Sequence, residues 1–188
     1  MRKLISFMHV SLDGFISGLN GEMDWIKVDE EIFDYVNHIT NLSDTAFYGR
    51  VTYEMMQSYW PNAANKPDAT KHDIEHSRWY NKVNKVILSK TLAGKNIPGT
   101  QIISDNIKEE VEKLKGNEGS NILMFGSPGA SQALTALNLI DEYWLYINPI
   151  LLGKGMPLFK NIQNKITLKL VESIPFSNGV ICLRYEKK

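Results

Sequence analysis

One ten-residue segment, residues 122–131, constrains the fold of this chain more than any other. Its first part, Ile122 to Phe125, is an apolar run typical of a buried strand, and a turn of small residues follows directly. Ser127 is suited to the N-cap of a helix. Pro128 is suited to the first helical position, because its missing N–H would be unpaired there anyway. The segment therefore predicts a strand, a tight turn and a helix in immediate succession.

The same turn is suited to bind an anion. Gly126 and Gly129 let a ligand approach the backbone, and the first N–H groups of a helix have no partner within it. A nucleotide cofactor with phosphate groups is one interpretation. The segment matches neither G-x-G-x-x-G nor a P-loop, so a tight connection without any ligand explains it equally well.

Strand-like and helix-like patterns alternate along the chain, and strands gather at the C-terminus. Strands are predicted at residues 4–10, 45–48, 85–89, 102–103, 121–125, 142–147, 166–173 and 180–186. Helices are predicted at residues 29–42, 51–59, 73–83, 106–114 and 130–139. The second helix should end at Trp60-Pro61, and Asn178-Gly179 should join the last two strands as a hairpin. This order predicts an α/β fold with a mostly parallel sheet and an antiparallel edge, and 188 residues suit a single domain spanning 1–188.

Charge and cysteine content argue against several classes of protein. The chain has 21 basic and 21 acidic residues, and this balance does not favour binding to nucleic acid or to an anionic membrane. Cys182 is the single cysteine, so no internal disulfide can form, and its strand-like surroundings indicate a thiol in the core. Ser6 and His9 interrupt the first apolar run, which is too short and polar for a signal peptide. We therefore expect a cytoplasmic protein.

Two further junctions carry groups that bind phosphate. Gly49-Arg50 and Thr52 stand where a predicted strand meets a helix, and the alternative role for Arg50 is an ion pair with Glu54 one turn on. Ser89-Lys90-Thr91 follows the next predicted strand, where an ordinary polar loop is the alternative. Because open α/β sheets bind ligands beyond the carboxyl ends of their strands, we expect all three junctions to lie together.

Histidines give no strong sign of a metal site. His72 and His76 are four residues apart and would share one helix face, but the chain lacks H-E-x-x-H. We expect a solvated helix face there and no metal.

Taken in order, these motifs resemble the dihydrofolate reductase-like superfamily over nearly the whole chain. Within it, the chain is most similar to the branch related to the C-terminal reductase domain of bacterial riboflavin biosynthesis, here as a stand-alone domain. The resemblance implies a three-layer fold with helices on both faces of the sheet. It rests on Ser11-Leu-Asp-Gly-Phe-Ile-Ser17, Gly49-Arg-Val-Thr-Tyr-Glu54, Val86-Ile-Leu-Ser-Lys-Thr91, Phe125-Gly-Ser-Pro-Gly129, Leu139-Ile-Asp-Glu-Tyr143 and Pro149-Ile-Leu-Leu-Gly-Lys-Gly155 with Leu158-Phe159.

The resemblance implies NADPH as the cofactor and hydride transfer as the reaction. Arg50 and Thr52, beside Gly49, would hold cofactor phosphates, and Ser89 and Lys90 would flank the adenosine ribose and its 2′-phosphate. The pyrophosphate would lie on the turn formed by Gly126, Ser127, Pro128, Gly129 and Ala130. Backbone at Val10, Ile16 and Gly18 would line the nicotinamide.

The substrate would be a small heterocycle or a ribosylaminopyrimidine, reduced at a C=N or C=O carbon. Asp13, a tyrosine such as Tyr146, or water would supply the proton. For Asp13 the alternative role is to cap the turn before Gly14.

Three departures from the family pattern leave other functions open. No arginine stands where dihydrofolate reductases grip the folate glutamate, and none of Glu30, Glu31 and Asp34 can be matched to their helix carboxylate. The zinc-containing deaminase domain that often accompanies the reductase is not in this sequence. A nucleotide-binding module without catalysis and a true dihydrofolate reductase are the alternatives. By analogy with relatives, the apolar stretches Tyr143 to Ile147 and Ile150 to Leu152 could extend a sheet into a homodimer.

Overall fold

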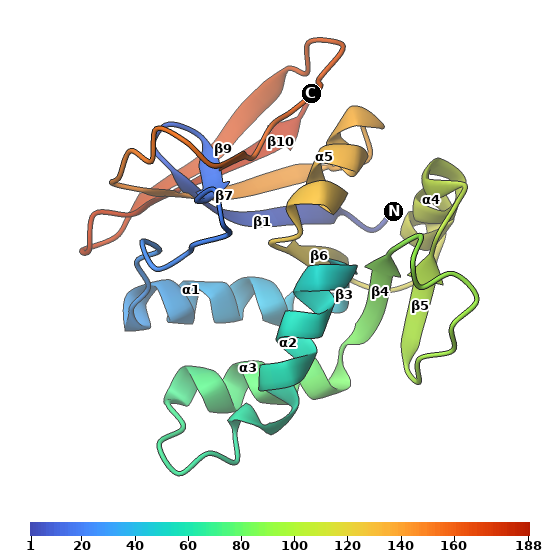
Figure 1. Cartoon of the computed structure of the whole chain (residues 1–188), viewed down its shortest axis with the longest axis horizontal. Coiled ribbons are helices and arrows are strands. Elements are labelled where there is room, and N and C mark those ends of the chain that lie inside the picture. The colour runs from blue at the N-terminus through green and yellow to red at the C-terminus, as the bar shows by residue number, and fades with distance from the viewer.

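The computed structural model describes residues 1–188, and its centre is an eight-stranded sheet with the strand order β5-β4-β3-β6-β1-β7-β10-β9 (Figure 1). The strands of this sheet are β1 (Leu4–Ser11), β3 (Ser43–Gly49), β4 (Asn84–Leu88), β5 (Thr100–Ile103), β6 (Asn121–Phe125), β7 (Glu142–Asn148), β9 (Leu168–Pro175) and β10 (Ile181–Lys187). The first six strands of this order, from β5 across to β7, are parallel to one another, whereas β10 runs antiparallel to both β7 and β9. The predicted α/β class, the mostly parallel sheet and the C-terminal hairpin are confirmed.

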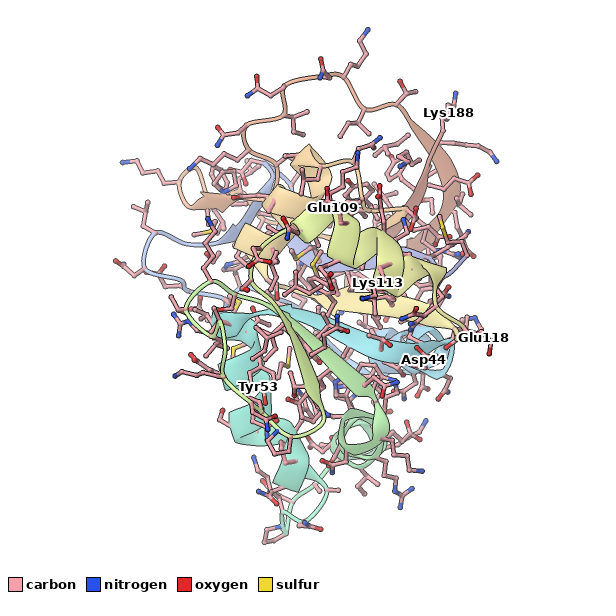
Figure 2. All side chains as sticks on the ribbon, turned by 90° about the vertical axis from the view of Figure 1, so that its right-hand side faces the viewer. Asp44, Tyr53, Glu109, Lys113, Glu118 and Lys188 are labelled. Carbon is pink, nitrogen blue, oxygen red and sulfur yellow. The ribbon has the colours of Figure 1, made fainter.

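Helices cover both faces of the sheet, as the resemblance implied. One layer is formed by α1 (Glu30–Asn41), α2 (Arg50–Ala63) and α3 (Lys71–Lys82), whose Ile32, Tyr53 and Tyr80 belong to one apolar core. The other layer is formed by α4 (Ile107–Gly116) and α5 (Pro128–Ala136), whose buried apolar residues belong to a second core. Figure 2 shows α4 in front of the sheet, with Glu109 and Lys113 on it. No helix has both the length and the apolar character that crossing a lipid bilayer requires.

Three local predictions can be compared directly with the structure. Asp29 caps α1 by accepting a hydrogen bond from the backbone N–H of Ile32 over 3.0 Å, as expected. Cys182 is fully buried, also as expected, and burial raises the pKa of its thiol to about 12. The predicted end of a helix at Trp60 is wrong, because α2 continues through Pro61 to Ala63. Ala63 is completely buried, and this packing outweighs the lost hydrogen bond of a proline close to the helix end.

The proposed dimer contact through residues 143–147 is also corrected by the strand order. Strand β7 is internal, because β1 pairs with one of its edges and β10 with the other. It has no free edge to offer a second copy of the chain. The strands at the two ends of the sheet are β5 and β9.

Candidate functional site

A cavity of about 820 Å³ lies at the carboxyl ends of β3, β4 and β6. The three junctions expected to lie together all reach it, contributing Gly49, Arg50, Thr52, Ser89, Lys90, Ser127, Pro128, Gly129 and Ala130. Its volume is within the range of pockets that hold cofactors or drug-sized ligands. The structure therefore brings together groups from Gly49 to Ala130 that are far apart in the sequence.

Ser127 holds two of these junctions together. Its backbone is left-handed, with φ of 61°, and its hydroxyl donates to the carbonyl of Phe125 at 3.0 Å and accepts from the N–H of Gly49 at 2.9 Å. Ser127 stands at the N-cap position, but its side chain makes no capping hydrogen bond to α5. The expected capping role is thus replaced by a link between the beginnings of α2 and α5.

The three helices that begin at the cavity lack side-chain caps, whereas the other two helices have them. No side-chain capping bond is made by the N-cap residues of α2, α4 and α5, which are Gly49, Asn106 and Ser127. In contrast, Asp29 caps α1 and Thr70 caps α3, and neither residue lines the cavity. Free N–H groups are consequently concentrated around the cavity, and their partial positive charge favours an anion there.

Space for a ligand exists directly above the start of α5. A Cβ atom added at Gly129 would meet no protein atom within 4 Å, although Gly129 lines the cavity. Pro128 has no N–H, so the donors available here are the N–H groups of Ser127, Gly129 and Ala130. Gly126 itself does not line the cavity, and its φ of 52° forms the turn behind it. Such a donor set fits a pyrophosphate group.

Three basic side chains line the cavity, and only one of them forms an ion pair with an acidic residue. Arg50 forms an ion pair with Glu54 at 2.7 Å, which was the alternative role for it, and both side chains are partly exposed. Lys90 and Lys160 also line the cavity and have no ion-pair partner. The hydroxyl of Ser89 accepts from the N–H of Leu92 at 3.3 Å and so holds the turn after β4. Lys90 is the more available of the two predicted ribose-phosphate residues.

Several lining residues were missed by the sequence analysis. They are Val51, Leu88, Ser104, Ile107, Gln132, Gly155, Met156, Pro157 and Lys160. The segment from Gly155 to Pro157 arrives because β8 (Met156–Pro157) pairs with β2 (Phe15–Ser17) in a small second sheet. A Cβ atom at Gly155 would overlap the carbonyl of Ser17, so this close pairing needs glycine. Two-residue strands leave almost no periodic signal in sequence, although the glycine-rich loop itself was noted.

The residues expected to line the nicotinamide are not part of this cavity. Val10 and Ile16 are buried in the core on the α4–α5 side of the sheet. Gly18 donates its N–H to the carbonyl of Glu22 at 2.9 Å. Ile16 belongs to β2 and Gly18 follows it, and β2 pairs with β8, whose Met156 and Pro157 line the cavity.

Asp13, one expected proton donor, ties two loops together. Its carboxylate accepts from the hydroxyl of Ser11 at 2.6 Å, from the N–H of Leu152 at 3.1 Å and from the N–H of Gly153 at 2.7 Å. The bond from the Ser11 hydroxyl, followed by the bonds from Gly153 and Leu152, lowers the pKa of Asp13. The carboxylate is therefore ionised at neutral pH.

Tyr146, the other expected donor, is fully buried in the core formed with α1. Its hydroxyl has no hydrogen-bond partner, and burial raises its pKa. Neither Asp13 nor Tyr146 lines the cavity.

The pair His72 and His76 does not form the solvated face that was expected. His76 is only 4% exposed and packs against Trp60, Trp79 and Phe125. Burial lowers its pKa to about 3. The prediction was wrong because α3 packs against α2, and this packing turns the face carrying His76 into the core. No group of three or more His, Cys, Asp or Glu side chains is placed to hold a metal ion.

Comparison with known proteins agrees with this geometry. The sequence model of the RibD C-terminal domain matches residues 2–182. Protein YyaP of Bacillus subtilis, whose function is uncharacterized, is 38% identical over 189 residues, covering 98% of this chain and 94% of YyaP. A riboflavin biosynthesis protein from Shewanella sp. PV-4 superimposes with a TM-score of 0.72 at 22% identity, over 99% of both chains. Dihydrofolate reductase from Enterococcus faecalis, complexed with NADP(H), superimposes with a TM-score of 0.64 at 14% identity, over 99% of this chain and 96% of that one. The two solved structures show the same fold.

Proposed function

The chain belongs to the RibD C-terminal domain family, and on that premise we propose that it is an NADPH-dependent reductase of a small heterocyclic substrate. Family membership supports a reductase-like function. The observation that carries the proposal is the meeting of three uncapped helix N-termini, Arg50 and Lys90 around one cavity. A ligand with several phosphate groups matches this donor set, and NADPH has a pyrophosphate and a 2′-phosphate.

In the proposed complex, the chain holds the cofactor mainly by its phosphates. The N–H groups of Ser127, Gly129 and Ala130 would bind the pyrophosphate, with Thr52 and Arg50 at the start of α2 beside them. Lys90 would contact the 2′-phosphate, and the turn held by Ser89 would position Lys90 for this contact. When bound, NADPH would supply the hydride. The protein would contribute orientation and electrostatic stabilisation.

For the nicotinamide end we retain Val10, Ile16 and Gly18 as the proposed residues. Val10 lies near the carboxyl end of β1, Ile16 lies in β2 and Gly18 follows β2. Strand β2 pairs with β8, whose Met156 and Pro157 line the cavity. A bound cofactor would pass from the cavity along this edge.

We propose water as the proton source for the reduction. Asp13 is ionised and already accepts three hydrogen bonds, and Tyr146 is buried with a raised pKa. Neither group is suited to release a proton at neutral pH. Asp13 and Tyr146 stay as alternatives, and Asp13→Asn tests the first of them.

The same observation favours a second candidate function, a nucleotide-binding module without catalysis. Such a module needs the phosphate-binding cavity but no proton donor. Dihydrofolate reductase activity is less well supported, because two carboxylates of α1 are occupied. Glu31 accepts from the N–H and hydroxyl of Ser177, at 2.9 and 2.8 Å, and Asp34 pairs with Lys71 at 2.7 Å.

We also propose a cytoplasmic homodimer, now through the loop after β7 rather than through β7. Leu151 is 69% exposed and Leu12 is 66% exposed. The N–H of Leu12 bonds to the carbonyl of Ile150 at 2.8 Å, so these two exposed leucines come from adjoining stretches of backbone. Light scattering of the wild type and of Leu151→Asp tests this contact. We expect a dimer that dissociates in the variant, and a monomeric wild type would contradict it.

Oxidation of NADPH, followed by absorbance, separates the candidate functions. Two substrates are offered in parallel, namely 5-amino-6-(5-phosphoribosylamino)uracil and dihydrofolate. We expect turnover of the ribosylaminopyrimidine and little turnover of dihydrofolate. NADPH binding without turnover of either compound would favour the binding module, whereas faster turnover of dihydrofolate would favour a dihydrofolate reductase.

A further inference from the structure

His9 stands near the carboxyl end of β1, on the sheet face opposite to Val10. Its ring packs against those of Phe7 and Tyr146, with centroid separations of 5.7 and 5.1 Å. Side chains alternate along a strand, so His9 and Phe7 face the α1 layer while Val10 faces the α5 layer. His9 is partly exposed, and it takes no part in the proposed reaction.

The side chain of Asn148 contacts His9, and its own orientation is fixed by two other partners. Its Oδ1 atom accepts from the backbone N–H of Lys27 at 2.8 Å, and its Nδ2 atom donates to the carbonyl of Tyr146 at 3.0 Å. Asn148 is fully buried. Rotating the amide by 180° would place a donor against the N–H of Lys27 and an acceptor against a carbonyl, leaving both partners unsatisfied.

This orientation determines which nitrogen of His9 carries the proton. The Nδ2 group of Asn148 is 3.4 Å from Nδ1 of His9, and because Nδ2 can only donate, Nδ1 must be the acceptor. The proton of the neutral ring is therefore on Nε2. Burial lowers the pKa of His9 to about 4, so the ring is neutral at pH 7. Nε2 makes no hydrogen bond within the protein and is not among its enclosed unpaired polar atoms.

We propose that His9 is a substrate-binding residue, whose Nε2–H donates a hydrogen bond to a carbonyl oxygen or ring nitrogen of the heterocycle. The proposal rests on the reductase function proposed above. His9 does not line the cavity described above. It lies near the carboxyl end of β1, between β6 and β7, at the edge of the sheet where ligands of open α/β folds bind, and no protein group bonds to its Nε2–H. A neutral imidazole N–H is a very weak acid. The role is thus recognition and orientation of the substrate, and the proton still comes from elsewhere.

The tautomer can be tested without any ligand or activity. In a ¹⁵N-labelled sample at pH 7, long-range ¹H–¹⁵N correlation spectra report which ring nitrogen is protonated. We expect His9 to show a single tautomer, protonated at Nε2. Protonation at Nδ1, or averaging between the two nitrogens, would overturn the proposal. Asn148→Asp should shift the proton toward Nδ1, because a carboxylate can only accept.

The binding role is tested with 5-amino-6-(5-phosphoribosylamino)uracil as the probe. His9→Phe keeps an aromatic ring but removes the donor, and His9→Gln restores an N–H donor. We expect the KM for the probe to rise at least tenfold in His9→Phe and to recover to within about threefold in His9→Gln. The affinity for NADPH should change less than twofold in both. Equal KM values in the wild type and His9→Phe would overturn the proposal.

His38→Gln is the matched control for these KM measurements, because His38 is an exposed histidine on α1.

Failure of the reductase proposal and failure of the His9 proposal can be distinguished. A wild type that does not bind NADPH contradicts the reductase, and the Nε2–H resonance of His9 then still reports whether the probe binds there. Normal NADPH binding with an unmoved His9 resonance at saturating probe contradicts the His9 proposal alone.

Discussion

The hydroxyl of Ser127 accepts a hydrogen bond from the backbone N–H of Gly49 at 2.9 Å, across 78 residues of sequence. This bond joins the beginning of α5 to the beginning of α2. It also occupies the one side chain that could have capped α5, so the N–H groups of that helix stay free for a ligand. Ser127 thereby sets the spacing between two helix N-termini at the cavity.

Ser127→Ala should lower both stability and cofactor affinity. The partly buried N–H of Gly49 would lose its acceptor, which costs about 1 kcal/mol of unfolding free energy. We also expect NADPH to bind at least fivefold more weakly, since the two helix starts are no longer held together. Urea unfolding and fluorescence titration measure the two effects. Ser131→Ala is the control, because Ser131 is buried on the same helix but does not line the cavity. A loss of affinity as large in the control would refute the argument.

Gly129→Asp should separate stability from binding. A Cβ atom at this position meets no protein atom within 4 Å, and a carboxylate in the first turn of α5 would interact favourably with the free N–H groups. We expect the melting temperature to be unchanged or higher, while NADPH affinity falls at least tenfold through repulsion of its phosphates. Gly129→Asn has the same shape without the charge and should lose less affinity. Equal affinities in wild type and Gly129→Asp would show that no anion binds at this turn.

Lys90→Ala should change the preference between cofactors. If Lys90 contacts the 2′-phosphate, the variant loses about tenfold in affinity for NADPH and almost nothing for NADH, which lacks that phosphate. The difference should shrink at high salt, because the lysine is exposed to solvent. Titrations with both cofactors measure it. Lys95→Ala, an exposed lysine outside the cavity, serves as the reference. Equal losses for NADPH and NADH would place Lys90 at the pyrophosphate instead.

Asp13→Asn tests whether Asp13 links two loops by hydrogen bonds or acts as the proton donor. An amide cannot accept well from three donors, so the N–H groups of Leu152 and Gly153 should exchange with solvent deuterium faster, while kcat falls less than tenfold. A fall in kcat of a hundredfold with unchanged exchange would instead identify Asp13 as the proton donor.

The same hydrogen bonds of Asp13 predict that the protection of the Leu152 and Gly153 amides depends on pH. Folding lowers the pKa of Asp13 from its ordinary value of 3.8. The carboxylate therefore stabilises the folded loops above that pH, and this contribution disappears as the pH falls through the lowered pKa of the folded state. Protection of the Leu152 and Gly153 amides should persist at pH 5 and decrease below pH 4 in the wild type. Asp13→Asn should show no such decrease.

Much of the fold could be predicted because the patterns were local and strong. The run Ile122 to Phe125, the helical spacing after Asp29 and the Asn178-Gly179 turn each indicated one structure, and the structure has each of them. The meeting of the Gly49, Ser89 and Gly126 turns required only the rule that parallel strands end at the same edge of a sheet.

The features that could not be predicted from the sequence depend on contacts between segments far apart in the chain. Pro61 stays inside α2 because Ala63 is buried, and His76 enters the core because α3 packs on α2. The hydroxyl of Ser127 bonds to Gly49 instead of to its own helix, a choice that only the three-dimensional arrangement decides. Lys160 and Gln132 reach the cavity from segments with no motif of their own.

The central claim, a phosphate-rich cofactor held by helix N-termini at this cavity, is tested most directly by thermal unfolding of the wild type with and without NADPH. NADPH at about 100 times its Kd should stabilise the folded protein by about 2.7 kcal/mol. For a domain of this size, that corresponds to a rise in melting temperature of roughly 5–10 °C. Gly129→Asp should show almost no rise at the same concentration. An unchanged melting temperature of the wild type at millimolar NADPH would contradict the account.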